Sequence, residues 1–234
     1  MNRTLQTRQA LAPDGQRITF GGVAESITDD WFWSVRVTGR TMSIGITIGR
    51  RSYVQRAITR EQLTVTQQIT YRGQPLTVAA TADGEGWFIG WEGLHRDLMT
   101  GGAGAPPSLQ SVVEMLDVLN IAESPDGLVL RPLAGSGTVL WGMSGKQFVP
   151  GAGSVTIYPK RESSALVPTE PGLKVGSGEV WSKSLQVDGA SRGRVFLHAG
   201  DTGVAIVRDD RDADLKVTDE GLEDLLGSLQ VRWS

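Results

Sequence analysis

Residues 31–48 read WFWSVRVTGRTMSIGITI, and this stretch decides the fold. Apolar and polar residues alternate in both halves, which is the period of a β-strand with one buried face. The shared faces hold Trp31, Trp33, Val35 and Val37 in the first half and Met42, Ile44, Ile46 and Ile48 in the second. A turn with a glycine lies between the two runs, so the stretch predicts an antiparallel β-hairpin.

The same pattern continues outward along the chain in both directions. Short extended runs recur at intervals of roughly ten residues, and the turns between them draw on the 30 glycines of the sequence. Strands of this length and spacing are typical of an antiparallel sandwich or barrel rather than of a parallel sheet. We therefore predict a mainly β fold built from antiparallel β-sandwich or open-barrel units.

Two segments have the period of a helix instead. Residues 108–121 begin with Ser108, a favourable N-cap, and carry apolar residues at positions 109, 112, 113, 116 and 119. Residues 219–229 follow Thr218 and begin with two acidic residues, which favour the first turn of a helix. We predict one central helix at 108–121 and a short C-terminal helix at 219–229.

The clearest break in the pattern is the segment 101–107, which reads GGAGAPP. Glycine and proline at this density do not sustain the interior of a strand or a helix. The segment therefore predicts a linker between a β-rich domain at 1–100 and a second domain at 108–234, which holds the central helix and further strands. The alternative is a single larger sandwich that the helix crosses.

Composition limits the classes of protein to which the chain can belong. With 39% hydrophobic and 21% charged residues, it has the balance of a soluble globular protein. It contains no cysteine, which excludes disulfides and thiolate metal sites. No apolar run approaches the roughly 18 residues that span a bilayer, and the N-terminal segment lacks the apolar core of a secretion signal. We expect no membrane span and a cytoplasmic site of synthesis, and the net charge of −3 disfavours nucleic acid as a partner.

Fragments that resemble known functional motifs each lack a required residue. Residues 95–98 read HRDL, as at the start of a protein-kinase catalytic loop, but Gly102 stands where the metal-binding asparagine is needed. Residues 210–214 have the opening spacing of a calcium loop, but its turn glycine and closing glutamate are missing. We therefore expect no metal site and no cofactor.

Charge is distributed unevenly along the chain. Residues 31–60 contain six arginines and no acidic residue, whereas residues 209–214 contain four aspartates. Two clusters of opposite sign can bind a partner or a second copy of the chain; the alternative is two solvated faces. The candidate interface residues are Arg36, Arg40, Arg50, Arg51, Arg56, Arg60, Asp209, Asp210, Asp212 and Asp214.

These features favour a non-enzymatic structural protein that acts by self-association or by docking in a larger complex. Its expected partners are other copies of itself or other subunits of an assembly, and exposed strand edges are further interface candidates. The composition of the whole chain is similar to that of tailed-phage virion proteins, such as tail, baseplate or connector subunits. That resemblance implies a virion component. It concerns the composition of the whole chain and the predicted fold class, is carried by no specific motif, and assigns no site residue.

A second interpretation is a ligand-binding, carbohydrate-binding or hydrolytic β domain. Tryptophan rings can stack on sugars, and His198 and Asp201 are close enough in sequence to meet across a turn as an acid–base pair. The candidate ligand-binding residues are Trp31, Trp33, Trp87, His198 and Asp201. A binding pocket would gather them on one concave surface, whereas an assembly protein would distribute them through its core.

Overall fold

A computed structural model describes residues 5–23, 31–40, 43–187, 190–209 and 218–234 of the chain. The fold is mainly β, with large antiparallel sheets, and this confirms the predicted class. The described residues form two compact units. Unit 1 is drawn from the described residues within 1–10, 16–31 and 144–234, and unit 2 from those within 11–15 and 32–143. No helix among the described residues is long and apolar enough to cross a membrane.

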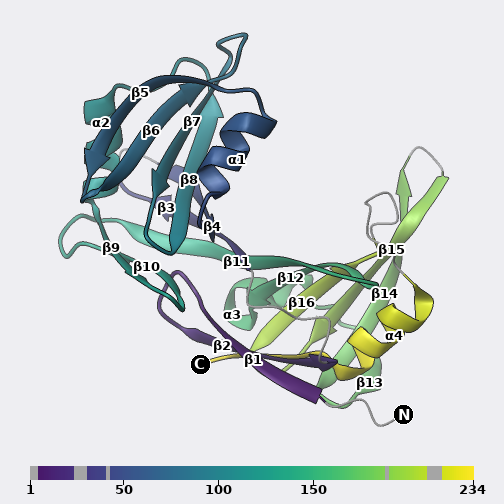
Figure 1. The fold of residues 1–234 in the computed structure, drawn as a ribbon. Coiled ribbons are helices and arrows are strands. Elements are labelled where there is room, and N and C mark those ends of the chain that lie inside the picture. Colours follow the sequence, from purple (N-terminus) through teal and green to yellow (C-terminus); the bar gives the residue numbers. More distant parts are fainter. Residues whose placement is uncertain (1–4, 24–30, 41–42, 188–189, 210–217) are drawn as a thin grey trace. The chain divides into compact units, whose positions relative to one another are not determined.

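Unit 2 is built on a sheet whose strands follow the order β11-β3-β4-β8-β7-β6-β5 (Figure 1). The strands are β3 (Phe32–Thr38), β4 (Ser43–Arg50), β5 (Thr64–Tyr71), β6 (Gln74–Ala80), β7 (Gly86–Glu92), β8 (Arg96–Ala103) and the first part of β11 (Val139–Val149). The unit also holds α1 (Tyr53–Arg60), α2 (Leu109–Asp117) and the hairpin of β9 (Leu119–Ser124) and β10 (Gly127–Pro132).

The hairpin predicted from residues 31–48 is confirmed as β3 and β4. Trp33 lies opposite Ile48, and Val35 lies opposite Ile46. All four of these side chains are buried, because alternation places them on the inner face of the sheet. Met42, which was expected on the same face, lies outside the described residues.

Unit 1 contains a sheet with the order β13-β14-β15-β16-β12-β11 and a smaller sheet with the order β1-β2-β17. Its elements are β1 (Leu5–Leu11), β2 (Arg17–Val23), β12 (Gly153–Pro159), α3 (Lys160–Ser163), a 3₁₀ turn (Ser164–Leu166), β13 (Leu173–Val175), β14 (Gly178–Val187), β15 (Ala190–Ala199), β16 (Gly203–Arg208), α4 (Asp219–Ser228) and β17 (Gln230–Trp233). In the smaller sheet β17 pairs with β2, so segments far apart in sequence are joined in one unit.

Both predicted helices are present. Helix α2 follows Ser108, whose side chain caps it as expected, but it ends at Asp117 instead of residue 121. It ends early because Leu119 enters β9 and lies opposite Pro132. Helix α4 covers the predicted range to within one residue, and the side chain of Thr218 caps its first turn.

Helix α1 was not predicted from the sequence. Its N-cap residue, Ser52, has a left-handed φ of 67° and makes no side-chain capping bond. The backbone N–H of Val54 donates instead to Oδ2 of Asp97 at 3.0 Å. Serine favours the N-cap position, but the side chain of Ser52 does not cap this helix, and the capping group comes from strand β8, which the local sequence does not reveal. The buried side chains of Val54 and Ala57 pack with Met99 and hold the helix on the sheet.

The predicted division at residues 101–107 does not match the two units of the structure. Residues 101–103 are the end of β8 and pair with β7, and the residues on both sides belong to unit 2. Glycine is required there because a Cβ atom at Gly102 would lie 2.6 Å from the ring of Trp87. The glycine run is therefore a strand that leaves room for an aromatic side chain, and the chain passes between the units elsewhere.

Candidate binding surfaces

The six candidate arginines all belong to unit 2, and all are exposed. Their positions are Arg36 in β3, Arg40 in the turn after it, Arg50 at the end of β4, Arg51 after that strand, and Arg56 and Arg60 in α1. The guanidinium of Arg56 lies 5.9 Å from the ring centroid of Tyr53. Their surface position agrees with the sequence analysis, and their role as an interface stays a prediction.

The acidic cluster differs from expectation at the one member that the structure describes. Asp209 is only 1% exposed, and its carboxylate lies 3.8 Å from Nε of Arg194. Asp209 is therefore part of the interior of unit 1 and is not a surface residue open to a partner. Asp210, Asp212 and Asp214 lie outside the described residues.

The tryptophans of the 31–48 stretch are core residues. Trp31 stacks on Phe20, with ring centroids 4.3 Å apart and ring planes at 15°. Trp33 is 6% exposed and faces the interior of unit 2. Neither ring is available to a ligand, because the alternation that aligns the aromatic rings also places them on the buried face.

His198 is completely buried in unit 1 and is held by a hydroxyl group. Its Nε2 lies 3.0 Å from Oγ of Ser177, and that hydroxyl donates its hydrogen to the carbonyl oxygen of Leu229. Ser177 must then accept from Nε2–H, which leaves Nδ1 unprotonated and without a partner among the described residues. Burial lowers the pKa of His198 below its ordinary value of 6.5, so the ring is neutral at pH 7. In this arrangement the hydroxyl hydrogen of Ser177 is directed at Leu229 and not at the ring of His198.

The acid–base pair of His198 and Asp201, which the alternative interpretation considered, does not form. The side chain of Asp201 is exposed in the turn before β16, whereas His198 is buried and bonded to Ser177. The five ligand candidates are also divided between the units, since Trp33 and Trp87 belong to unit 2 and the other three to unit 1.

Trp87 is the member of this set that lines a pocket. It is half-buried, and together with Arg40 it borders a hollow of about 410 Å³ against α2, where Glu114 and Met115 form the facing side. The structure thus brings together Arg40 from the interface candidates and Trp87 from the ligand-binding candidates.

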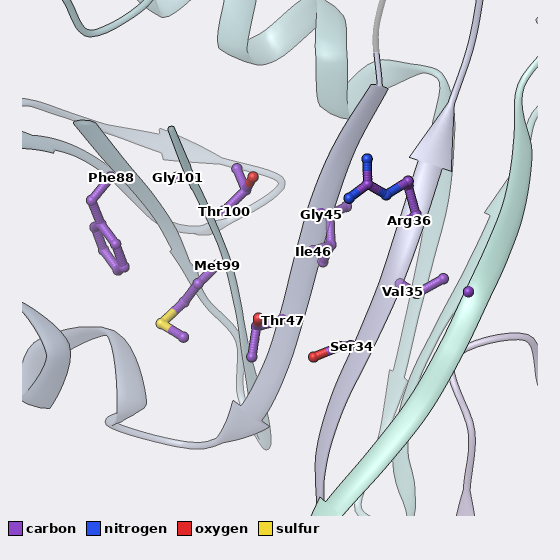
Figure 2. Close-up of a pocket in the computed structure, with 11 residues that line it drawn as sticks. Ser34, Val35, Arg36, Gly45, Ile46, Thr47, Phe88, Met99, Thr100 and Gly101 are labelled. Atoms are coloured by element: carbon purple, nitrogen blue, oxygen red, sulfur yellow. The ribbon is translucent and has the colours of Figure 1, made fainter. Parts of the chain in front are cut away.

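A second hollow, of about 450 Å³, lies on the face of the unit 2 sheet that carries α1 (Figure 2). Ser34 lies opposite Thr47 across β3 and β4, and Thr47 lies opposite Met99 across β4 and β8. Opposed residues in antiparallel strands point to the same side of the sheet, so these three side chains share the face. Arg36 shares it too, because it lies opposite Gly45 in the same pairing.

Gly45 forms the floor of this hollow. A Cβ atom added there would meet nothing within 4 Å, which shows that the space above the residue is open. The ring of Phe88 and the thioether of Met99 line the side next to α1, and Arg36 lines the opposite side. The charge pattern of the sequence indicates Arg36 as a candidate, but the hollow does not follow from the sequence, because β4 and β8 are neighbours only in the folded sheet.

Strand β5 forms the outer edge of the unit 2 sheet. It reads TVTQQITY, carries no charged residue, and has six of its eight residues exposed. No strand among the described residues pairs with its free side. An edge of this kind presents unpaired backbone N–H and C=O groups that can accept a further strand.

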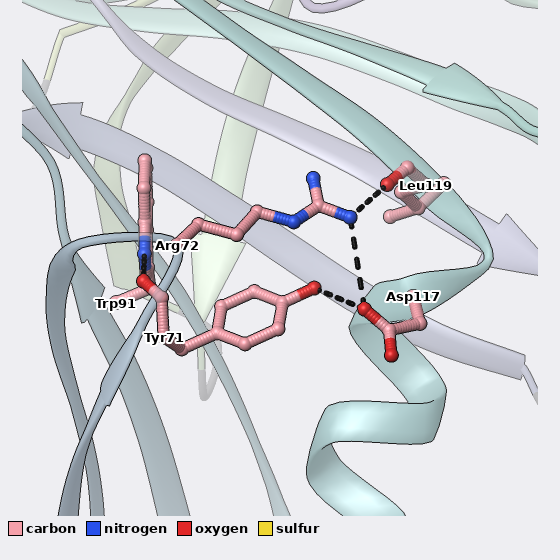
Figure 3. Close-up of polar contacts among 5 residues, drawn as sticks. All are labelled: Tyr71, Arg72, Trp91, Asp117 and Leu119. Carbon is pink, nitrogen blue, oxygen red and sulfur yellow. Dashed lines mark hydrogen bonds and ion pairs between the residues drawn. The ribbon is translucent and has the colours of Figure 1, made fainter.

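The end of this edge strand is anchored by a polar network (Figure 3). The hydroxyl of Tyr71 donates to Oδ1 of Asp117 at 2.7 Å, and the guanidinium of Arg72 lies 3.7 Å from the same oxygen. Arg72 also donates to the carbonyl of Leu119 at 2.9 Å, and the indole of Trp91 donates to the carbonyl of Tyr71 at 3.1 Å. Burial, and then the bond to Asp117, raise the pKa of Tyr71 to about 12.

Among the described residues, no group of three His, Asp or Glu side chains lies close enough together to hold a metal ion. Comparison of the chain with models of protein families, with curated protein sequences and with solved structures finds no match in any of the three.

Proposed function

We propose that this chain is a non-enzymatic structural protein that assembles with a second copy of itself by edge-to-edge pairing of its β5 strands. One observation carries the proposal, namely that β5 is a long, uncharged and exposed strand at the edge of its sheet. Proteins commonly protect such edges with charged residues or proline, or by shortening the strand, because an open edge recruits other chains. Strand β5 contains no lysine, no charged residue of any kind and no proline.

Unit 1 supports this interpretation by contrast. The edge strand of its larger sheet, β13, is only three residues long and contains Lys174. Both features discourage strand addition. The outer edge strands of the two larger sheets therefore differ, and β5 has the composition of a pairing surface.

The regular part of the β5 edge is short and self-complementary. A bulge between Val65 and Gln67 breaks the pairing with β6, and the ladder is regular from Gln67 to Tyr71. An antiparallel pair with two-fold symmetry about Ile69 would place Gln67 of each copy opposite Tyr71 of the other. Such a pair brings no charges of like sign together, which makes a second copy the occupant that we propose.

For the biological setting we propose a phage-type virion, where subunits pack in many copies. This part of the proposal is supported only by the similarity in composition to tail, baseplate and connector proteins. The pairing of β5 strands does not depend on it.

The test is the mass of the purified chain, measured by light scattering after size exclusion at low and high salt. We expect twice the chain mass of 25.1 kDa at both salt concentrations, since β5 contributes no charge to the contact. The double variant Gln67→Lys/Thr70→Lys changes two exposed side chains, one on each face of the edge, and is expected to be a monomer.

Leu94→Lys is the matched control, because Leu94 is an exposed apolar residue in the turn before β8 and does not lie on this edge. It should remain dimeric. A wild-type chain that is monomeric at high concentration would overturn the proposal, and so would a double variant that keeps the dimer mass. An oligomer that dissociates in salt would point to the exposed arginines in place of β5.

A further inference from the structure

We propose that the hollow above Gly45 is a binding site for a small monocarboxylate with an apolar body. The inference concerns a different surface from the β5 edge and does not depend on the proposed function. The hollow has a volume of about 450 Å³, which is in the range of small-molecule sites. The site combines one cationic group, the hydroxyl groups of Ser34 and Thr47, and an apolar wall, and each part matches one part of such a ligand.

The cationic group is the guanidinium of Arg36, which is held in place by an aromatic ring. It lies 5.4 Å from the ring centroid of Trp141, and the indole N–H of Trp141 donates to Oγ1 of Thr38 at 2.8 Å. The ring is therefore anchored to the same strand that carries Arg36. No carboxylate among the described residues forms an ion pair with Arg36, so its planar donors remain available to an incoming carboxylate.

The hydroxyl groups come from neighbouring positions on the same face. Ser34 is two residues before Arg36 in β3, so both side chains are on the same face, and Thr47 lies opposite Ser34 in β4. Both line the hollow with Arg36. Hydroxyl groups both donate and accept, so they can bind a carboxylate oxygen or a polar substituent of the ligand.

The apolar wall is formed by Phe88 and Met99. Both pack against the buried residues Val54 and Ala57 of α1, which fixes this side of the hollow. An aromatic or aliphatic body placed here would be covered by a ring and a thioether, both of which pack well on apolar and aromatic surfaces. A single guanidinium balances the single charge of a carboxylate, whereas a phosphate would call for further donors.

Gly45 allows a test that fills the site without disturbing the fold. A side chain at this position meets no atom within 4 Å of its Cβ, and β-branched residues favour strands, so Gly45→Val should fold as well as the wild type. The probe is phenylacetate, with the neutral phenylacetamide as its uncharged analogue. Binding is followed by NMR at the side-chain N–H signals of Arg36 and Trp141.

We expect phenylacetate to shift both signals in a saturable way and to bind in the millimolar range that suits a ligand of this size. Phenylacetamide should bind about tenfold more weakly, because it lacks the charge that pairs with Arg36. Gly45→Val should abolish the shift of the Trp141 signal while its unfolding midpoint stays equal to or above that of the wild type. Arg36→Gln should weaken binding of phenylacetate to the level of the amide.

Arg51→Gln is the matched control, since Arg51 is exposed on the same unit but does not line the hollow. It should bind phenylacetate like the wild type. The inference is overturned if the wild type shows no saturable shift, if acid and amide bind equally, or if a folded Gly45→Val variant binds as the wild type does.

Discussion

The carboxylate of Asp97 in β8 accepts a hydrogen bond from the backbone N–H of Val54, 43 residues earlier in the chain, at 3.0 Å. Asp97 is completely buried, and its second oxygen, Oδ1, has no partner among the described residues. Helix α1 is thus capped by a charged group from the sheet that it covers. Burial is the main cause that raises the pKa of Asp97 to about 6, with smaller contributions from the carboxylates of Glu92 and Glu123.

This arrangement predicts that unit 2 loses stability between about pH 4 and pH 7. The pKa is higher in the folded state than the ordinary value of 3.8, so the folded state binds the proton more tightly. The stabilisation from Asp97 is complete below pH 3.8 and is lost as the pH rises through about 6. We expect a loss of about 2–3 kcal/mol in unfolding free energy from this group. Asp97→Asn should flatten the dependence, as measured by urea unfolding across this range; an unchanged slope would contradict the prediction.

Unit 1 should show the opposite dependence on pH through His198. Burial lowers the pKa of this ring below 6.5, so its stabilisation is present above pH 6.5 and is lost as the pH falls through the lower, folded-state value. NMR titration should show His198 protonating at lower pH than an unfolded histidine.

Ser177→Ala should destabilise unit 1 because it removes the partner of two groups at once. The variant leaves Nε2–H of His198 without its acceptor and the carbonyl of Leu229 without its donor. We expect a cost of about 1–3 kcal/mol in thermal or chemical unfolding. A variant as stable as the wild type would show that water replaces the hydroxyl.

Two glycines of the same sheet should respond in opposite ways to alanine. A Cβ atom at Gly90 would lie 2.5 Å from Cγ1 of Val54, so Gly90→Ala should overpack the contact with α1 and cost about 1–3 kcal/mol. Gly45→Ala meets no atom within 4 Å and should be neutral or stabilising by up to about 1 kcal/mol. Val54→Ala should relieve the clash, and a double-mutant cycle with Gly90→Ala measures the coupling.

Tyr71→Phe tests the anchor at the end of β5. Loss of the 2.7 Å bond to Asp117 should cost about 0.5–1.5 kcal/mol in unfolding free energy at neutral pH. The pKa of about 12 lies above the ordinary 10.0, so the stabilisation is present below pH 10.0 and lost as the pH rises through about 12. Titration of tyrosinate absorbance should lose its highest step in the variant. If the step remains, it belongs to another of the three tyrosines.

Features that depend on neighbouring residues could be predicted from the sequence. Alternation alone placed β3 and β4 in a hairpin with Trp33 and Val35 buried, and local capping residues located α2 and α4. Features that depend on distant residues could not be predicted. The cap of α1 comes from Asp97, and the glycines near residue 102 suggested a linker because the ring of Trp87, which requires them, approaches only in the folded sheet.

The candidate sites divide in the same way. The exposure of the six arginines was correctly inferred from charge, and the uncharged composition of residues 64–71 is visible in the sequence. That β5 lies at an edge, and that Arg36 faces Phe88 and Met99 across a hollow, follows from a strand order that no local pattern records. Binding surfaces on a sheet are properties of strand order, and strand order is set by contacts between residues distant in sequence.

The pairing of β17 with β2 has a consequence for synthesis. Residues 32–143 of unit 2 leave the ribosome as one continuous block, apart from the short segment 11–15 that precedes them. Unit 1 cannot complete its smaller sheet until Trp233 arrives opposite Ile18, more than two hundred residues later. Vectorial translation therefore favours folding of unit 2 first. The backbone groups of β2 that pair with β17 remain without their partners until residues 230–233 have been made.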